Sequence, residues 1–160
     1  MSGNLTRHLQ PEANLGYLFR LAHQRFRAAL DEALEDLGLS AQEYGILSAS
    51  VTRTELSASE LARITQVTRQ TMHTAVLGLE AAGLLERRPR NRRVVLVRPT
   101  KRGRKTLEAA TERVRAIEGA ALAGLGRNDE RVIRTWLANL AAVTDEHSAD
   151  RGRADRATRS

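Results

Sequence analysis

The stretch that decides the fold is residues 57–98, which read SASELARITQVTRQTMHTAVLGLEAAGLLERRPRNRRVVLVR. Its first four residues, Ser57 to Glu60, have the spacing of a capping box, in which a hydroxyl and a carboxylate satisfy the free amides at the start of a helix. The polar pair Thr65-Gln66 predicts a tight turn, and Thr68 can cap a second helix that runs to about Ala82. This half of the stretch is therefore a helix-turn-helix.

The second half of the stretch changes from helical to β periodicity. Gly83 supplies a left-handed residue that ends the preceding helix. Two runs of β-forming residues, 84–88 and 94–98, flank the polar tip Pro89-Arg90-Asn91-Arg92. Two such runs around a turn-forming tip predict a β-hairpin. A helix-turn-helix that leads directly into a basic hairpin is a winged helix-turn-helix.

Long amphipathic helices are predicted before and after this stretch. Apolar residues recur at three- and four-residue steps from Ala13 to Gly38, and a second capping box at residues 40–43 begins the next helix. On the other side Pro99 stops the second strand, and Thr100 can cap a helix that runs to about Leu125. The predicted fold class is mainly α with a small β-hairpin.

The two ends of the chain have a different character. A last helix is predicted from Asn128, where Asp129 and Glu130 favour a helix start. Residues 1–12 are polar and aperiodic, which predicts a flexible N-terminal arm. Residues 148–160 are small and charged, without an apolar period, which predicts a disordered basic tail.

Composition excludes several classes of protein. The 160 residues contain no Cys, which excludes disulfides, thiolate metal sites and Cys nucleophiles. The four His residues are scattered without metal-binding spacing, and neither a phosphate-binding loop nor a dinucleotide fingerprint occurs, so we expect no metal, no cofactor and no enzymatic activity. Apolar runs are too short to span a bilayer and no signal-peptide core is present. We expect a cytoplasmic protein that does not contact membranes.

The charge of the chain is concentrated in one place. The net charge is +7, and residues 86–105 contain ten basic residues and one acidic residue, so the rest of the chain is slightly acidic. An Arg-rich composition with solvated charges would spread the excess more evenly. A local excess of this kind is typical of a surface that binds a polyanion.

The helix that begins after Thr68 is predicted to enter the major groove of DNA. Arg and Gln side chains on its exposed face can bond base edges, although the same residues would also suit a solvated helix face. The hairpin arginines would meet phosphates or a narrow minor groove. On this reading the candidate DNA-binding residues are Arg69, Gln70, His73, Thr74, Arg88, Arg90, Arg92 and Arg93.

The order and spacing of four segments resemble the MarR family of bacterial transcription regulators. The segments are LSASELA at 56–62, VTRQT at 67–71, LEAAGL at 79–84 and RRVVLV at 92–97, and the resemblance covers roughly residues 13–147. It implies a homodimer whose first, fifth and sixth helices interlock, with residues 13–38 and 101–147 as the dimerisation region and residues 39–100 as the DNA-binding region. It also implies a pseudo-palindromic promoter site and, commonly, release by a small-molecule effector. The DNA-contact positions of the family correspond to Thr68, Arg69, Gln70, Thr71 and His73 in the helix and to Asn91, Arg92 and Arg93 in the wing, so the resemblance adds Thr68, Thr71 and Asn91 to the candidate DNA-binding residues.

Two departures from the family pattern fall in the wing. The Asp-x-Arg motif of the family corresponds to Asn91-Arg92-Arg93, so a neutral hydrogen bond would replace the ion pair that orients the wing arginine, here Arg93. The loop is also about two residues shorter than usual. These departures leave two functions open. One is a sequence-specific, double-stranded DNA-binding regulator, usually a repressor. The other is a nucleic-acid-associated interaction module that binds RNA, a protein partner or DNA without sequence preference.

Overall fold

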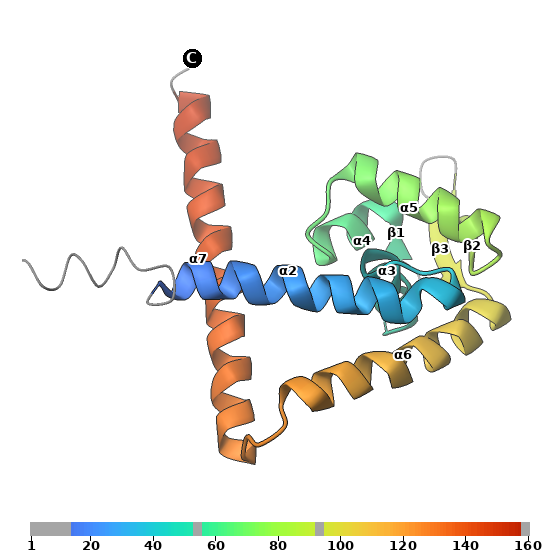
Figure 1. The fold of residues 1–160 in the computed structure, drawn as a ribbon. Helices are drawn as coiled ribbons and strands as arrows, with labels where there is room; N and C mark the ends of the chain where they lie inside the picture. Colours follow the sequence, from blue (N-terminus) through green and yellow to red (C-terminus); the bar gives the residue numbers. More distant parts are fainter. Residues whose placement is uncertain (1–13, 53–55, 92–94, 158–160) are drawn as a thin grey trace, which may run out of the picture. The chain divides into compact units, whose positions relative to one another are not determined.

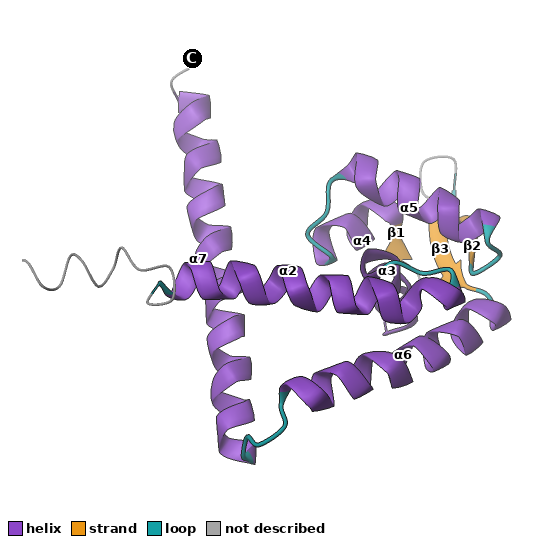
Figure 2. Cartoon of the chain, in the orientation of Figure 1, coloured by secondary structure: helices purple, strands orange, loops and turns teal. Residues whose placement is uncertain are grey.

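The structure is a computed structural model that describes residues 14–52, 56–91 and 95–157, with side chains up to residue 143. The chain is mainly helical with one small sheet, as the sequence predicts (Figure 1 and Figure 2). Its elements are α2 (Leu15–Leu34), the 3-10 helix η2 (Glu35–Leu37), α3 (Ala41–Thr52), β1 (Leu56–Ser57), α4 (Ala58–Ile64), α5 (Arg69–Ala81), β2 (Leu85–Pro89), β3 (Val95–Pro99), α6 (Lys101–Ala121) and α7 (Arg127–Ala157).

The first long helix has a defined start and a tightened end. The side chain of Asn14 accepts a hydrogen bond from the backbone N–H of Tyr17 at 3.1 Å, so α2 begins at Leu15. Its last turn is the 3-10 helix η2, and Gly38 then adopts a left-handed φ of 67°. The predicted extent is confirmed, including the role of Gly38, while the change to 3-10 geometry was not predicted.

The next helix, α3, is held at its start by two carboxylates. The predicted capping box is present: the backbone N–H of Ser40 donates to Glu43 at 2.9 Å, and the hydroxyl of Ser40 accepts from the N–H of Glu43 at 3.2 Å. Asp31 of α2 accepts a further bond from the N–H of Ala41 at 2.6 Å. The junction between α2 and α3 is therefore fixed by side chains of both helices.

The sheet has three antiparallel strands in the order β1-β3-β2, where the sequence predicted two. Leu85 pairs with Pro99 at one end of the hairpin, and Pro89 pairs with Val95 at the other. The unpredicted strand β1 pairs Leu56 with Val97. Two residues are too few to show a β period in the sequence, so only the approach of β3 defines β1 as a strand. Pro99 is the last residue of β3 and does not stand after it, because a strand end tolerates a missing N–H donor.

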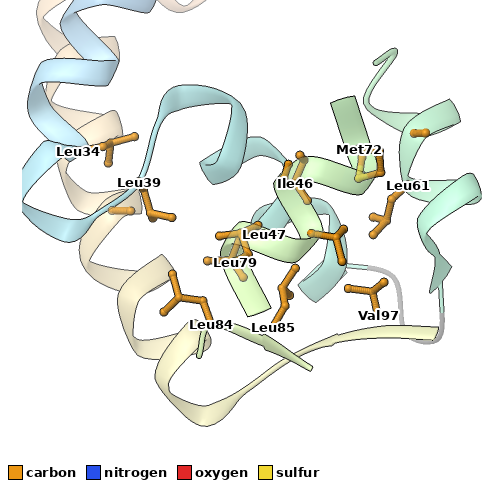
Figure 3. Close-up of a cluster of buried hydrophobic side chains, with 14 of the residues drawn as sticks. Leu34, Leu39, Ile46, Leu47, Leu61, Met72, Leu79, Leu84, Leu85 and Val97 are labelled. Carbon is orange, nitrogen blue, oxygen red and sulfur yellow. The ribbon is translucent and has the colours of Figure 1, made fainter. Parts of the chain in front are cut away.

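The core lies between α2, α3, α4, α5, α6 and the sheet (Figure 3). The predicted inward residues of α5, Met72, Val76 and Leu79, are all buried, and Ala75 joins them. Burying one such side chain contributes about 1.5–3 kcal/mol, so burial of this cluster is the main favourable contribution to folding of the region. The largest fully buried side chains are Leu34, Ile46, Leu47, Leu61, Met72, Leu79, Leu85 and Val97.

The helix α6 is anchored at its N-terminus by Thr100, as predicted. The Thr100 hydroxyl accepts from the N–H of Gly103 at 2.9 Å and donates to the carbonyl of Gly83 at 2.7 Å. The helix ends at Ala121, four residues before the predicted end, and Gly124 follows with a φ of 84°.

The last helix is longer than predicted. The carboxylate of Asp129 accepts from the N–H of Gly126 at 2.9 Å, so α7 begins at Arg127. The helix then continues to Ala157, and the prediction that residues 148–160 are a disordered tail is wrong for residues 148–157. The prediction relied on the missing apolar period, whereas the many Ala and Arg residues favour helix without one. The chain divides into two compact units, residues 1–117 and 118–160.

Candidate nucleic-acid interface

The first helix of the helix-turn-helix, α4, begins with a complete capping box. The N–H of Ser57 donates to the Glu60 carboxylate at 2.8 Å, and the Ser57 hydroxyl accepts from the N–H of Glu60 at 3.3 Å. Hydrogen bonds from the side chain and backbone of Ser57 lower the pKa of Glu60, and the charges of Arg63 and Arg90 lower it further.

The turn between α4 and α5 contains a residue whose conformation was not predicted. Gln66 has a φ of 56°, the one positive φ among the described residues other than glycine. The backbone N–H of Val67 bonds the carbonyl of Ala62 at 3.1 Å, which closes the turn. A side chain in left-handed geometry costs about 1 kcal/mol, and the burial of Leu61 and Ala62 beside it offsets that cost. The pair Thr65-Gln66 signals a turn but not this geometry.

The helix α5 presents its predicted reading face to solvent. Thr68 caps it by accepting from the N–H of Thr71 at 3.1 Å, and the two hydroxyls lie 2.8 Å apart. Arg69, Gln70, His73 and Thr74 are exposed near this N-terminus, while Thr71 is half-buried with its hydroxyl engaged in the cap. The helix therefore carries polar side chains at one end of its outer face and an apolar face against the core.

The wing presents basic side chains beyond the sheet. Arg88, Arg90 and Asn91 are exposed, and the Nε atom of Arg88 lies 2.9 Å from a Glu86 carboxylate oxygen. Arg92 and Arg93, which the sequence also assigns to DNA contact, lie outside the described residues. The described part of the wing thus carries exposed positive charge at the end of β2 and just after it.

One contact between helix and wing was missed by sequence reasoning. Glu80 of α5 and Arg87 of β2 form an ion pair, with Nε and Oε2 2.8 Å apart. Neither residue was assigned to the site. They are seven positions apart, and the helix end at Gly83 lies between them, so no helical or strand period relates one to the other. Only the fold brings the end of the helix against the strand.

A polar groove adjoins the reading face of α5. It has a volume of about 580 Å³ and lies between α2, the start of α3 and α5. Arg27 and Glu43 line one side, and Gln70, Thr71 and Thr74 line the other. A molecule bound in this groove would touch the same residues that the sequence assigns to DNA contact.

The described part of the chain contains neither a candidate metal site nor a membrane-spanning helix. Within residues 14–52, 56–91 and 95–157, no group of three or more His, Asp or Glu residues is placed to hold a metal ion. In the same ranges no helix has the length and hydropathy needed to cross a membrane.

Known proteins match both the sequence and the fold. The family model described as the MarR family matches residues 37–93. The HTH-type transcriptional repressor Rv2887 of Mycobacterium tuberculosis is 33% identical over 136 residues, which cover 84% of this chain and 98% of the repressor. The crystal structure of Rv2887 in complex with DNA has a TM-score of 0.65 at 34% identity, covering 79% of this chain and 96% of that one.

A more distant structure shows the same fold. CouR of Rhodococcus jostii, bound to p-coumaroyl-CoA, has a TM-score of 0.75 at 23% identity and covers 82% of this chain and 94% of its own. The match to Rv2887 extends over the helix-turn-helix, the basic wing and the long helices on either side of them. The chain is a member of the MarR family of transcriptional regulators.

Proposed function

We propose that the protein is a sequence-specific, double-stranded DNA-binding transcriptional repressor. In this proposal it acts as a homodimer on a pseudo-palindromic promoter site and is released by a small-molecule effector. The observation that carries the proposal is the exposed polar face at the N-terminus of α5, with Arg69, Gln70, His73 and Thr74 beside a basic wing. The repressor Rv2887, one third identical to this chain, has been solved in complex with DNA.

The two parts of this surface have different roles in the proposal. Arg69 and Gln70 bond base edges in the major groove, because both side chains can make paired hydrogen bonds that distinguish one base pair from another. Arg88, Arg90 and the neighbouring wing arginines contact phosphates, which sets affinity and register without reading sequence. Thr68 and Thr71 act mainly through the cap that orients the first turn of α5.

Dimerisation is supported by apolar side chains that remain exposed on the long helices. Leu15 and Leu18 of α2 are 61% and 42% exposed, and Val132 and Leu137 of α7 are 55% and 42% exposed. Apolar groups spaced along helices in this way suit an interface with a second copy of the chain. A two-fold dimer would place one α5 on each half of a palindromic site.

Release by an effector is supported by the polar groove beside α5 and by the known ligands of a relative. Rv2887 has been solved in complex with salicylic acid and with p-aminosalicylic acid. For this chain, an effector would act by binding more tightly to the shape that does not fit DNA. A ligand in the groove would touch Gln70 and Thr74, so it would act directly on the reading face.

The decisive experiment is selection of genomic fragments by the purified protein at near-physiological salt, followed by sequencing. We expect a two-fold symmetric site, and light scattering in parallel should give the mass of a dimer. A V132S/L137S variant, matched against E112Q on α6, should reduce the dimer fraction. Recovery of no common site, with binding that disappears as salt rises, would instead favour the interaction module that binds nucleic acid without sequence preference.

A further inference from the structure

We propose that Glu80 and Arg87 are positioning residues for DNA binding, and this inference rests on the proposed function. Their ion pair joins the recognition helix α5 to the wing strand β2 with an Nε to Oε2 distance of 2.8 Å. The pair holds the wing at one angle relative to the helix. It thereby sets where the wing arginines lie when α5 occupies the major groove.

The strand pairing explains why Arg87 is available for this role. Side chains alternate between the two faces of a strand, so Arg87 shares a face with Leu85, while Arg88 points to the other face. Leu85 is buried in the core, and Val97, the cross-strand partner of Arg87, is buried too. Arg87 therefore lies on the face that α5 covers, next to Glu80. Its guanidinium is paired with Glu80, whereas Arg88 lies on the other face and pairs with Glu86.

The pair is placed where it can influence the position of the wing tip. Arg90 follows Arg87 by three residues, about 10 Å along an extended strand. Glu80 follows Gln70 by ten residues, about 15 Å along the helix. A change of angle at Arg87 therefore displaces Arg90 more than it displaces Leu85, which is only two residues from Arg87 and buried in the core.

Folding does not depend strongly on this contact. The side chains of Arg87 and Glu80 are 41% and 33% exposed, and exposed ion pairs contribute little to the free energy of folding. The ion pair with α5 can therefore orient the wing without being needed for folding.

The test uses the full-length protein and the duplex recovered by genomic selection. E80Q and R87Q are compared with wild type and with the swapped variant E80R/R87E, and E112Q, which removes an ion pair within α6, is the matched control. Affinity is measured at several salt concentrations. We expect E80Q and R87Q each to weaken binding about tenfold and to lower the salt slope by about one, because a wing phosphate contact is lost. The swapped variant should recover most of the affinity, and thermal melting should be almost unchanged in all four variants.

Other outcomes would overturn the inference in distinguishable ways. If Arg87 contacted phosphate directly, E80Q would bind more tightly than wild type, and the swapped variant would remain weak. If the pair had only a structural role, melting temperature would fall and affinity would follow it. If wild type itself selected no specific site, the proposed function would fail before the pair was tested.

Discussion

Arg113 of α6 holds the carboxylate of Asp36 with both terminal nitrogens. Its Nη2 atom donates to Oδ2 at 2.9 Å, Nη1 donates to Oδ1, and Nη1 also donates to the carbonyl of Ala33 at 2.8 Å. Asp36 lies in η2, at the end of the first long helix, so the contact joins two segments that are 77 positions apart. Paired Arg–carboxylate contacts of this geometry are among the stronger ion pairs in proteins.

The Asp36–Arg113 contact should make stability depend on pH in one direction. The hydrogen bond from Arg113 lowers the pKa of Asp36, so its charged form is favoured in the folded state. A lowered folded pKa adds stability above the unfolded pKa, and this stability is lost as pH falls through the folded value. D36N should therefore melt below wild type at pH 7, and the difference should shrink below about pH 4. Thermal melting between pH 3 and pH 7 measures this. A difference that stayed constant across the range would contradict the role given to the Asp36 charge.

Two glycines of α6 should respond in opposite ways to alanine. A Cβ at Gly103 would overlap the backbone of Leu84, whose carbonyl carbon lies 2.9 Å from the ideal Cβ position, whereas nothing lies within 4 Å of a Cβ at Gly119. G103A should destabilise by about 1–3 kcal/mol through overpacking. G119A should stabilise by up to about 1 kcal/mol through a less flexible unfolded chain. Urea unfolding compares the two, and equal effects would show that the contact between Gly103 and Leu84 has room to relax.

Substitution of Gln70 should change which DNA is bound. Gln70 is exposed in the first turn of α5, two residues after the cap at Thr68, and a paired hydrogen bond to adenine is its most discriminating contact. Q70A should lose about 1–3 kcal/mol on the preferred site and tolerate other bases at one position in each half-site. Sequencing of the sites selected by wild type and by Q70A checks this. Identical preferences would place the reading face elsewhere on α5.

Substitution of Arg90 should instead weaken binding to every sequence. Arg90 is exposed at the start of the wing tip. In the proposed function it contacts phosphate and does not contact bases. R90A should lower the slope of log affinity against log salt by about one, with the base preference retained. Titrations at three or more salt concentrations measure the slope, with R115A on α6 as control. An unchanged slope would mean that Arg90 does not contact phosphate.

Local signals predicted much of the candidate site. The cap at Thr68, the box at Ser57 and the inward residues Met72, Val76 and Leu79 each depend on neighbours within one or two helical turns. Such interactions depend only on a few consecutive residues, so the spacing of residue types in the sequence was sufficient to predict them. The exposed positions of Arg69, Gln70 and His73 follow from the same helical period.

The amino-acid sequence by itself determined where helices start, which faces turn inward and where positive charge gathers. Only the tertiary structure decided that Leu56 pairs with Val97 as a third strand, that Glu80 meets Arg87, and that Arg113 reaches Asp36. In each of these cases the two partners are separated in sequence, and no local pattern around either residue predicts the other as its partner. Their contacts exist because burial of the shared core brings distant backbone segments together, and the free energy of that burial belongs to the whole cluster and not to any one stretch of the chain.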